Sequence, residues 1–217
     1  RRVEATSFLR IIPEDPYAEF PEPEDEDYED FFIMPSNEDI VEHFYDTKTV
    51  DPSDGDALVG EYLAEDIVDE GVDEEDETEV VYSAGIRLES KVVGDIADLG
   101  YDEVKIVDRG EGINPVILNT IERDSTHTPD EAFKKLFGLL RPNDPYSLEN
   151  AKEYIYGSFF DEERIDLERV GRYKINKKLG HKDTEPEDLE ERVLTPDDLL
   201  EAFEYFLEVS DGNKEVD

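Results

Sequence analysis

Hydrophobic residues recur at helical spacing in the second half of the chain, in three segments that each follow a helix-start signal. The clearest signal is Thr128-Pro129-Asp130-Glu131, with a capping hydroxyl, an early proline and a glutamate three residues after the cap. Ser147 and the run Thr195-Pro196-Asp197-Asp198 begin the other two segments. We therefore predict three amphipathic helices. Their buried positions are expected to be Phe133, Leu136, Phe137 and Leu140; Ala151, Tyr154, Ile155 and Phe159; and Leu199, Leu200, Phe203, Phe206 and Leu207.

Residues 57–110 show a different pattern, in which short apolar runs alternate with turn-forming and acidic residues. A helical period over 89–99 ends at Gly100, which is a common helix stop. The acidic stretch 69–77 predicts the tip of a hairpin. The runs that predict strands are 58–64, 78–82 and 103–107. We interpret 57–110 as a small β-rich module inserted into a helical chain.

The first 56 residues combine a short apolar segment, an acidic proline-rich stretch and one helix. Apolar residues in 3–12 favour a helix that ends at Pro13. The stretch 13–30 sets prolines among carboxylates and offers little to bury, so we predict a linker that does not order itself, which Tyr17, Phe20 and Tyr28 could attach to a neighbouring part. Ser36 is the expected cap of a helix that continues to Tyr45. The predicted fold class is α+β, with segments at 1–12, 13–56, 57–110 and 111–217.

The chain is strongly acidic. It has 217 residues, with 62 Asp and Glu against 22 Lys and Arg, and a net charge of −40. An aromatic content of 10% indicates a folded core, because disordered acidic chains are poor in aromatic residues. Such a charge strains a compact state by self-repulsion unless salt screens it. Two accounts remain open: a protein adapted to high internal salt, or a free-standing acidic module that binds basic proteins as a DNA mimic.

The sequence offers no motif for catalysis, cofactor binding or metal binding. The carboxylates are too many for any pair to stand out, and His43, His127 and His181 lie far apart in polar contexts. Acidic stretches near 51–56 and 69–76 lack the spacing of calcium loops. We therefore predict no catalytic, cofactor-binding or metal-binding residue. The absence of cysteine suits a reducing, cytoplasmic location, no run is long enough to span a membrane, and the opening Arg suggests a fragment.

A basic island interrupts the acidic chain at 164–182. Seven of the 22 basic residues fall there: Arg164, Arg169, Arg172, Lys174, Lys177, Lys178 and Lys182. Apolar Leu167, Val170 and Leu179 recur at roughly helical spacing, which predicts a helix that buries them and exposes the cations. The cations could form a solvated face or pair with neighbouring carboxylates. They could equally form a surface that meets phosphates.

Five stretches of the chain resemble the bacterial RNA polymerase β subunit, in the order of that family. The run from Arg164 to Leu179 resembles its R-Y-D-L-x-x-V-G-R-x-K-x-N-x-x-L segment, and Leu139 to Pro145 resembles its M-R-P-G-E-P-P loop. The start of the chain is similar to R-R-K-L-P-x-T-x-L-L-R. Near the other end, L-T-P-D-D and D-G-N-K-E-V-D resemble L-T-x-x-D and N-G-K-G-E-V-D-D. The module at 57–110 resembles the β-rich insertions of such subunits.

This resemblance implies a role in transcription. It assigns 1–12 and 111–217 to the lobe of the β subunit, which lines the downstream DNA cleft of a nucleotidyltransferase. The implied partners are the β′, α, ω and σ subunits and downstream duplex DNA, and the catalytic Mg²⁺ is expected on β′. The loop after Leu140 lacks the family's glycine, since Asn143 occupies its place. The candidates for residues near DNA are Arg141, Arg169, Arg172, Lys174, Lys177 and Lys178.

Overall fold

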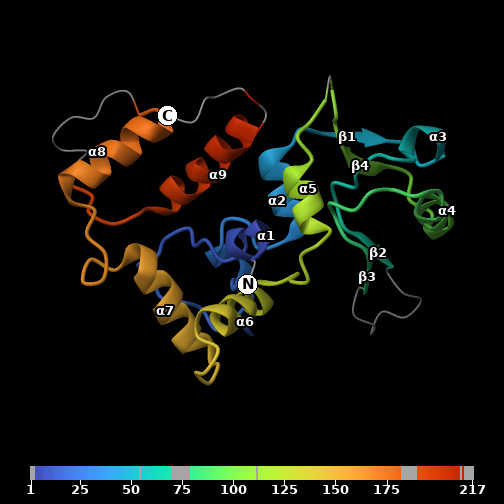
Figure 1. Ribbon diagram of the computed structural model, residues 1–217. Coiled ribbons are helices and arrows are strands. Elements are labelled where there is room, and N and C mark those ends of the chain that lie inside the picture. The colour runs from blue at the N-terminus through green and yellow to red at the C-terminus, as the bar shows by residue number, and fades with distance from the viewer. Residues whose placement is uncertain are drawn as a thin grey trace. The chain divides into compact units, whose positions relative to one another are not determined.

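The computed structural model describes residues 3–53, 55–69, 79–110, 112–181, 190–210 and 212 (Figure 1). The chain divides into two compact units. The helical unit comprises the described residues of Ser7–Ile33 and Thr128–Asp217, with Val3. The mixed unit comprises Glu4–Thr6 and the described residues of Met34–His127. Helices predominate over short strands in the described chain, which confirms the predicted α+β class.

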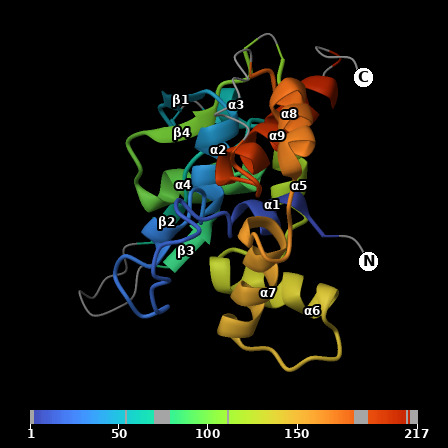
Figure 2. The ribbon, with the colours of Figure 1, turned by 90° about the vertical axis from the view of Figure 1, so that its left-hand side faces the viewer.

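The helical unit is built on two helix pairs. Helix α6 (Pro129–Leu140) packs on α7 (Leu148–Phe160), and α8 (Glu168–Leu179) packs on α9 (Pro196–Ser210) (Figures 1 and 2). The unit also contains the short helix η1 (Glu29–Phe31), and α1 (Ala5–Leu9) spans the boundary between the units. No helix in the described residues is long and apolar enough to cross a bilayer.

Local capping explains where α6 and α7 begin. The Thr128 hydroxyl accepts a hydrogen bond from the Glu131 N–H at 3.4 Å. The Ser147 hydroxyl accepts one from the Asn150 N–H at 3.1 Å. These are the predicted caps, so both helix starts are confirmed. The predicted stripe on α6 is buried as far as Phe137, whereas Leu140 in the last turn is 53% exposed.

The acidic stretch after Pro13 is packed against α6 and α7, contrary to the expectation of an unordered linker. Phe20 lies in the core cluster that contains Phe133, with 6.1 Å between the two ring centroids. The Tyr28 hydroxyl donates to Asp130, and the Glu14 N–H donates to the Phe31 carbonyl at 2.9 Å. Aromatic residues spaced among the carboxylates therefore reach the core while most carboxylates stay in solvent. The amino-acid composition of the stretch did not predict this packing, because composition does not contain the spacing of the aromatic residues.

The mixed unit contains two separate strand pairs. Strand β1 (Thr47–Val50) pairs antiparallel with β4 (Val104–Val107), and β2 (Ile67–Asp69) pairs antiparallel with β3 (Glu79–Tyr82). Helix α4 (Ser90–Leu99) packs into one core with residues of both pairs. That buried core consists of Leu58, Leu63, Ile67, Leu88, Val93, Ile96, Val104 and Ile106.

Some elements of the mixed unit agree with the sequence prediction and others differ from it. Helix α2 (Asn37–Phe44) begins with the predicted cap, since the Ser36 hydroxyl accepts from the Asp39 N–H at 3.1 Å. The predicted strand at 58–64 is instead the end of α3 (Gly55–Leu58) followed by isolated bridges. Strand β1 was not predicted. The remaining helix is α5 (Val116–Ile121), and the predicted hairpin tip lies outside the described residues, except for Asp69.

We expect residues 34–127 to fold when expressed alone and residues 57–110 to fail. The shorter piece, 57–110, lacks β1. In the described residues, β1 is the strand that forms a two-stranded sheet with β4. The shorter piece also lacks α2 and α5, which pack on each other. Amide dispersion in NMR spectra of the two pieces is the measurement. A dispersed spectrum from 57–110 would show that the module is complete without β1, α2 and α5.

Candidate nucleic-acid interface

Helix α8 carries most of the predicted DNA-proximal residues. It ends at Gly180, whose φ of 95° is left-handed and whose N–H donates to the Asn176 carbonyl at 3.0 Å. Lys177 and Lys178 occupy the last turn, where cations interact favourably with the helix dipole. Local chemistry therefore accounts for the end of α8 and for part of its basic character.

The inward face of α8 differs from the predicted one. Val170, expected to be buried, is 63% exposed. Arg172, expected on the surface, is 4% exposed, and Asn176 one turn later is also buried. The expectation that the Arg172 guanidinium faces solvent is therefore wrong. The inward orientation of Arg172 could have been predicted from the sequence. Ile175 and Leu179 are spaced by four residues, and on a helix they share a face with Arg172.

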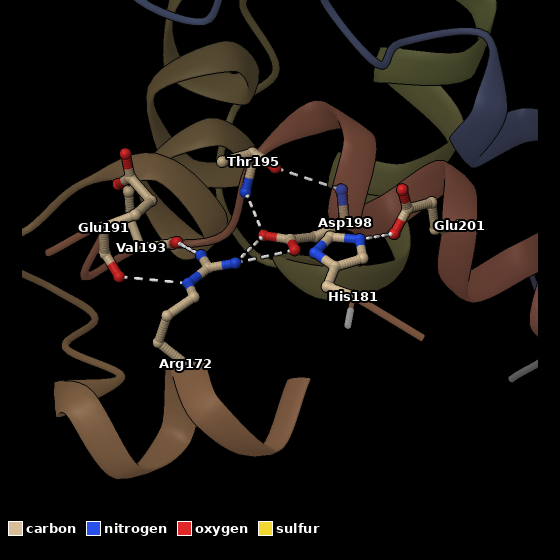
Figure 3. Close-up of polar contacts among 7 residues, drawn as sticks. All are labelled: Arg172, His181, Glu191, Val193, Thr195, Asp198 and Glu201. Atoms are coloured by element: carbon tan, nitrogen blue, oxygen red, sulfur yellow. Dashed lines mark hydrogen bonds and ion pairs between the residues drawn. The ribbon is translucent and has the colours of Figure 1, made fainter. Parts of the chain in front are cut away.

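Arg172 is fixed by four acceptor atoms (Figure 3). Its Nη1 donates to the two carboxylate oxygens of Asp198, at 2.8 and 2.7 Å. Its Nε donates to the Glu191 carbonyl at 3.1 Å, and its Nη2 donates to the Val193 carbonyl. The side chains of Arg172 and Asp198 are only 4% and 3% exposed. This arrangement, here called the Arg172 clamp, joins α8 to the segment that leads into α9.

Asp198 has a second role at the start of α9. Its Oδ2 accepts from the Thr195 N–H at 2.8 Å, and its own N–H donates to the Thr195 hydroxyl at 3.1 Å (Figure 3). These reciprocal bonds form the capping box that the sequence signal at Thr195 predicts. One carboxylate thus both caps α9 and neutralises Arg172, so the two helices share a single buried polar centre.

The other basic residues of the island divide into paired and unpaired groups. Arg164 pairs with Glu153 at 2.8 Å and with Asp161 at 3.3 Å. The Lys178 ammonium lies 5.2 Å from the centroid of the Tyr205 ring. Lys182 lies outside the described residues. Within the described chain, three exposed cations of α8 form no ion pair: Arg169, Lys174 and Lys177.

Arg141 lies at the end of α6 and is held locally. Its Nε donates to Asp144 Oδ2 at 2.6 Å, and its guanidinium lies 5.1 Å from the centroid of the Tyr154 ring. The hydrogen bond to Asp144 raises the pKa of Arg141 above its usual value. Arg141 and Arg164 both line a surface pocket of about 310 Å³, which the end of α6, the loop after it and α7 also line. The Arg141 side chain is 48% exposed while it is paired with Asp144.

The remaining ionisable groups suggest no reaction centre. Among the described residues, no group of three or more His, Asp or Glu side chains could hold a metal ion. The His181 ring nitrogen Nε2 lies 2.7 Å from Glu201 Oε2, which links the end of α8 to α9 (Figure 3). The contacts described here hold α8 and α9 together and leave cations on the exposed face of α8.

A comparison with known protein families shows which family this chain belongs to. The family model for RNA polymerase Rpb2, domain 2, matches residues 101–217, which is more than half of the chain. The chain belongs to this family. The matched residues include all six candidates near DNA, together with α8, the Arg172 clamp and the loop after α6 of this chain.

Several proteins similar to this chain are RNA polymerase β subunits. The DNA-directed RNA polymerase subunit beta of Protochlamydia amoebophila is 34% identical over 83% of this chain and 14% of its own length. The corresponding subunit of Treponema denticola is 29% identical over 84% of the chain and 17% of its length. That of Koribacter versatilis is 35% identical over 70% of the chain and 10% of its length. This Rpb2 domain 2 chain thus spans less than a fifth of the length of these relatives.

Proposed function

We propose that this chain is part of the β subunit of a DNA-directed RNA polymerase and forms a section of the lobe beside the downstream DNA. The match to Rpb2 domain 2 and the names of the similar proteins support this role. In this proposal the parent enzyme extends RNA by nucleotidyl transfer, its Mg²⁺ is held on β′, and its partners include β′, α, ω and σ. The family match leaves the free-standing DNA mimic without support.

The main support for a contact between α8 and DNA is the set of cations on the exposed face of this helix. Arg169, Lys174 and Lys177 are exposed and unpaired within the described residues, although the chain as a whole has a net charge of −40. In so acidic a protein, cations that remain free of carboxylates are available to an external anion. In our proposal they contact DNA phosphates, which fixes position without reading sequence. Lys178 and Arg141 are further candidates, and Arg172 supports the face from within.

We further propose that the acidic surface is an adaptation to high internal salt. The chain holds 62 carboxylates against 22 basic side chains, and most carboxylates of the stretch 14–30 are exposed. At molar salt the Debye length falls to about 3 Å, so neighbouring surface charges repel each other weakly. The same surface would keep DNA away from the other faces of this chain and leave α8 as the attractive one.

Neutralising two of these cations should reduce the salt dependence of DNA binding. In a polymerase assembled with this β subunit, Lys174→Gln with Lys177→Gln should flatten the slope of log K against log salt by about 1.8, since each phosphate contact contributes about 0.9. Both lysines are exposed, so the double variant should fold normally. The measurement is the equilibrium constant K for binding of the assembled polymerase to a DNA scaffold at several salt concentrations.

A matched pair of lysines on other helices provides the control. Lys91 on α4 and Lys134 on α6 are also exposed, and replacing both by Gln changes the net charge by the same amount. This control variant should keep the original slope. Equal slopes for the α8 variant and the unmodified enzyme would show that α8 does not contact DNA phosphates.

A further inference from the structure

The exposed face of α8 carries apolar side chains among its cations. Val170 is 63% exposed and Tyr173 is 48% exposed. This orientation follows from the Arg172 clamp, because Arg172 and Asn176 take the inward positions of the helix. The apolar pair therefore points into solvent together with the unpaired cations. A face built only to attract phosphates needs no aromatic ring.

Tyr173 has no partner within the described chain. Several other tyrosine hydroxyls are used internally: Tyr45 donates to the Asn114 carbonyl at 2.8 Å, and Tyr156 donates to the Ile11 carbonyl at 2.8 Å. Even Tyr17, which is 68% exposed, donates to the Phe160 carbonyl at 3.3 Å. Among the described residues, none forms a hydrogen bond with the Tyr173 hydroxyl or a ring contact with its side chain. As far as the described residues go, its ring and hydroxyl are both left without a contact.

Helical geometry places the ring between positive charges. Arg169, Tyr173 and Lys177 are spaced by four residues, so they form one row with steps of about 6 Å along the helix. Val170 and Lys174 form the adjacent row. The ring thus has a guanidinium one turn before it and an ammonium one turn after it. This alternation of cation, ring and cation matches a ligand whose flat apolar groups alternate with negative charges.

We propose that α8 binds an unpaired nucleic-acid strand, with the Tyr173 ring packed against a base and Arg169, Lys174 and Lys177 on the flanking phosphates. This inference rests on the proposed function, in which α8 faces DNA, and adds which form of the nucleic acid it meets. A duplex hides the faces of its bases, whereas an unpaired strand exposes them. Aromatic rings beside cations are the usual means of holding such strands without sequence preference.

The test compares Tyr173→Ala and Tyr173→Phe in the assembled polymerase. The DNA probes are one scaffold with an unpaired stretch beside the downstream duplex and one fully paired downstream of the active centre. We expect Tyr173→Ala to shorten the lifetime of the complex about tenfold on the first scaffold, which is the size of one lost stacking contact. The second scaffold should respond little. Because no charge is removed, the slope against salt should stay unchanged, and Tyr173→Phe should keep the original lifetime.

The outcomes separate this inference from the proposed function. If Tyr173→Ala changes neither scaffold while the Lys174 and Lys177 variant still flattens the slope, the inference is wrong and the DNA-facing role stands. If neither variant has an effect, the DNA-facing role itself fails. Equal loss on both scaffolds would rule out a preference for the unpaired strand. If Tyr173→Ala lowers the yield of assembled enzyme instead, the ring contacts another subunit, and the inference is again wrong.

Discussion

Replacing Arg172 by alanine should lower the free energy of unfolding of the helical unit by about 3–5 kcal/mol, the usual cost of removing one partner from a buried ion pair. The side chain of Asp198 is only 3% exposed, so its charge would stay in a poorly solvated site where any water admitted replaces the guanidinium only in part. The carbonyls of Glu191 and Val193 lose a donor at the same time. The loss therefore exceeds that of a surface pair, which is typically below about 1 kcal/mol.

Urea unfolding followed through NMR amide signals of α8 and α9 is the measurement, because it reads this unit separately from the mixed unit. Arg169→Ala is the matched control: it removes the same side chain one turn earlier, from an exposed position, and should change stability by about 0.5 kcal/mol or less. A loss below about 1 kcal/mol for Arg172→Ala would contradict the clamp.

Two further variants distinguish a buried clamp from a simple charge. Arg172→Lys keeps the charge but cannot present the planar fork that serves four acceptors, so it should still be clearly destabilised. Replacing Arg172 by Met together with Asp198 by Leu removes both charges and should recover much of the lost stability. Recovery would be incomplete, because Asp198 also belongs to the capping box with Thr195.

Local chemistry is what the sequence predicted well. The starts of α2 and α6 follow from Ser36 and Thr128, whose hydroxyls act on residues only three positions away. Long-range pairing was not accessible in the same way. Strand β1 has an undistinguished sequence and exists because Val104–Val107 pairs with it more than fifty residues later. The packing of the acidic stretch depends similarly on Phe133, which is distant in the sequence.

The candidate interface was predicted in outline but not in orientation. The exposure of Arg169, Lys174 and Lys177 agrees with the expected cationic face. The error at Arg172 arose because Val170 was counted as buried and Ile175 was left out of the apolar stripe. A buried arginine is uncommon without a partner, and that partner, Asp198, lies 26 residues away. The local sequence of α8 does not indicate that Asp198 is the partner of Arg172, so the pairing could be identified only from the fold.

Raising potassium chloride from about 0.1 M to about 2 M should increase the thermal midpoint of the chain by roughly 10 °C, as the Debye length falls from about 10 Å to below about 3 Å. Salt has two opposing effects here. It screens repulsion among 62 carboxylates opposed by only 22 basic side chains. It also weakens exposed ion pairs such as Arg192–Asp166, but each such pair contributes less than about 1 kcal/mol. The buried Arg172 clamp is screened far less, so the relief of repulsion should dominate.

A variant with fewer carboxylates tests whether repulsion among them causes the salt dependence of the thermal midpoint. Exposed acids in 14–30 are suitable because their side chains lie in solvent while the aromatic residues between them hold the segment. Changing Glu22, Glu24, Asp25, Glu26 and Asp27 to the corresponding amides should raise the midpoint at low salt and reduce its dependence on salt. Sucrose, which stabilises by exclusion without screening charge, should raise the midpoint of both proteins equally. A midpoint that stays flat or falls with potassium chloride would remove the basis for salt adaptation.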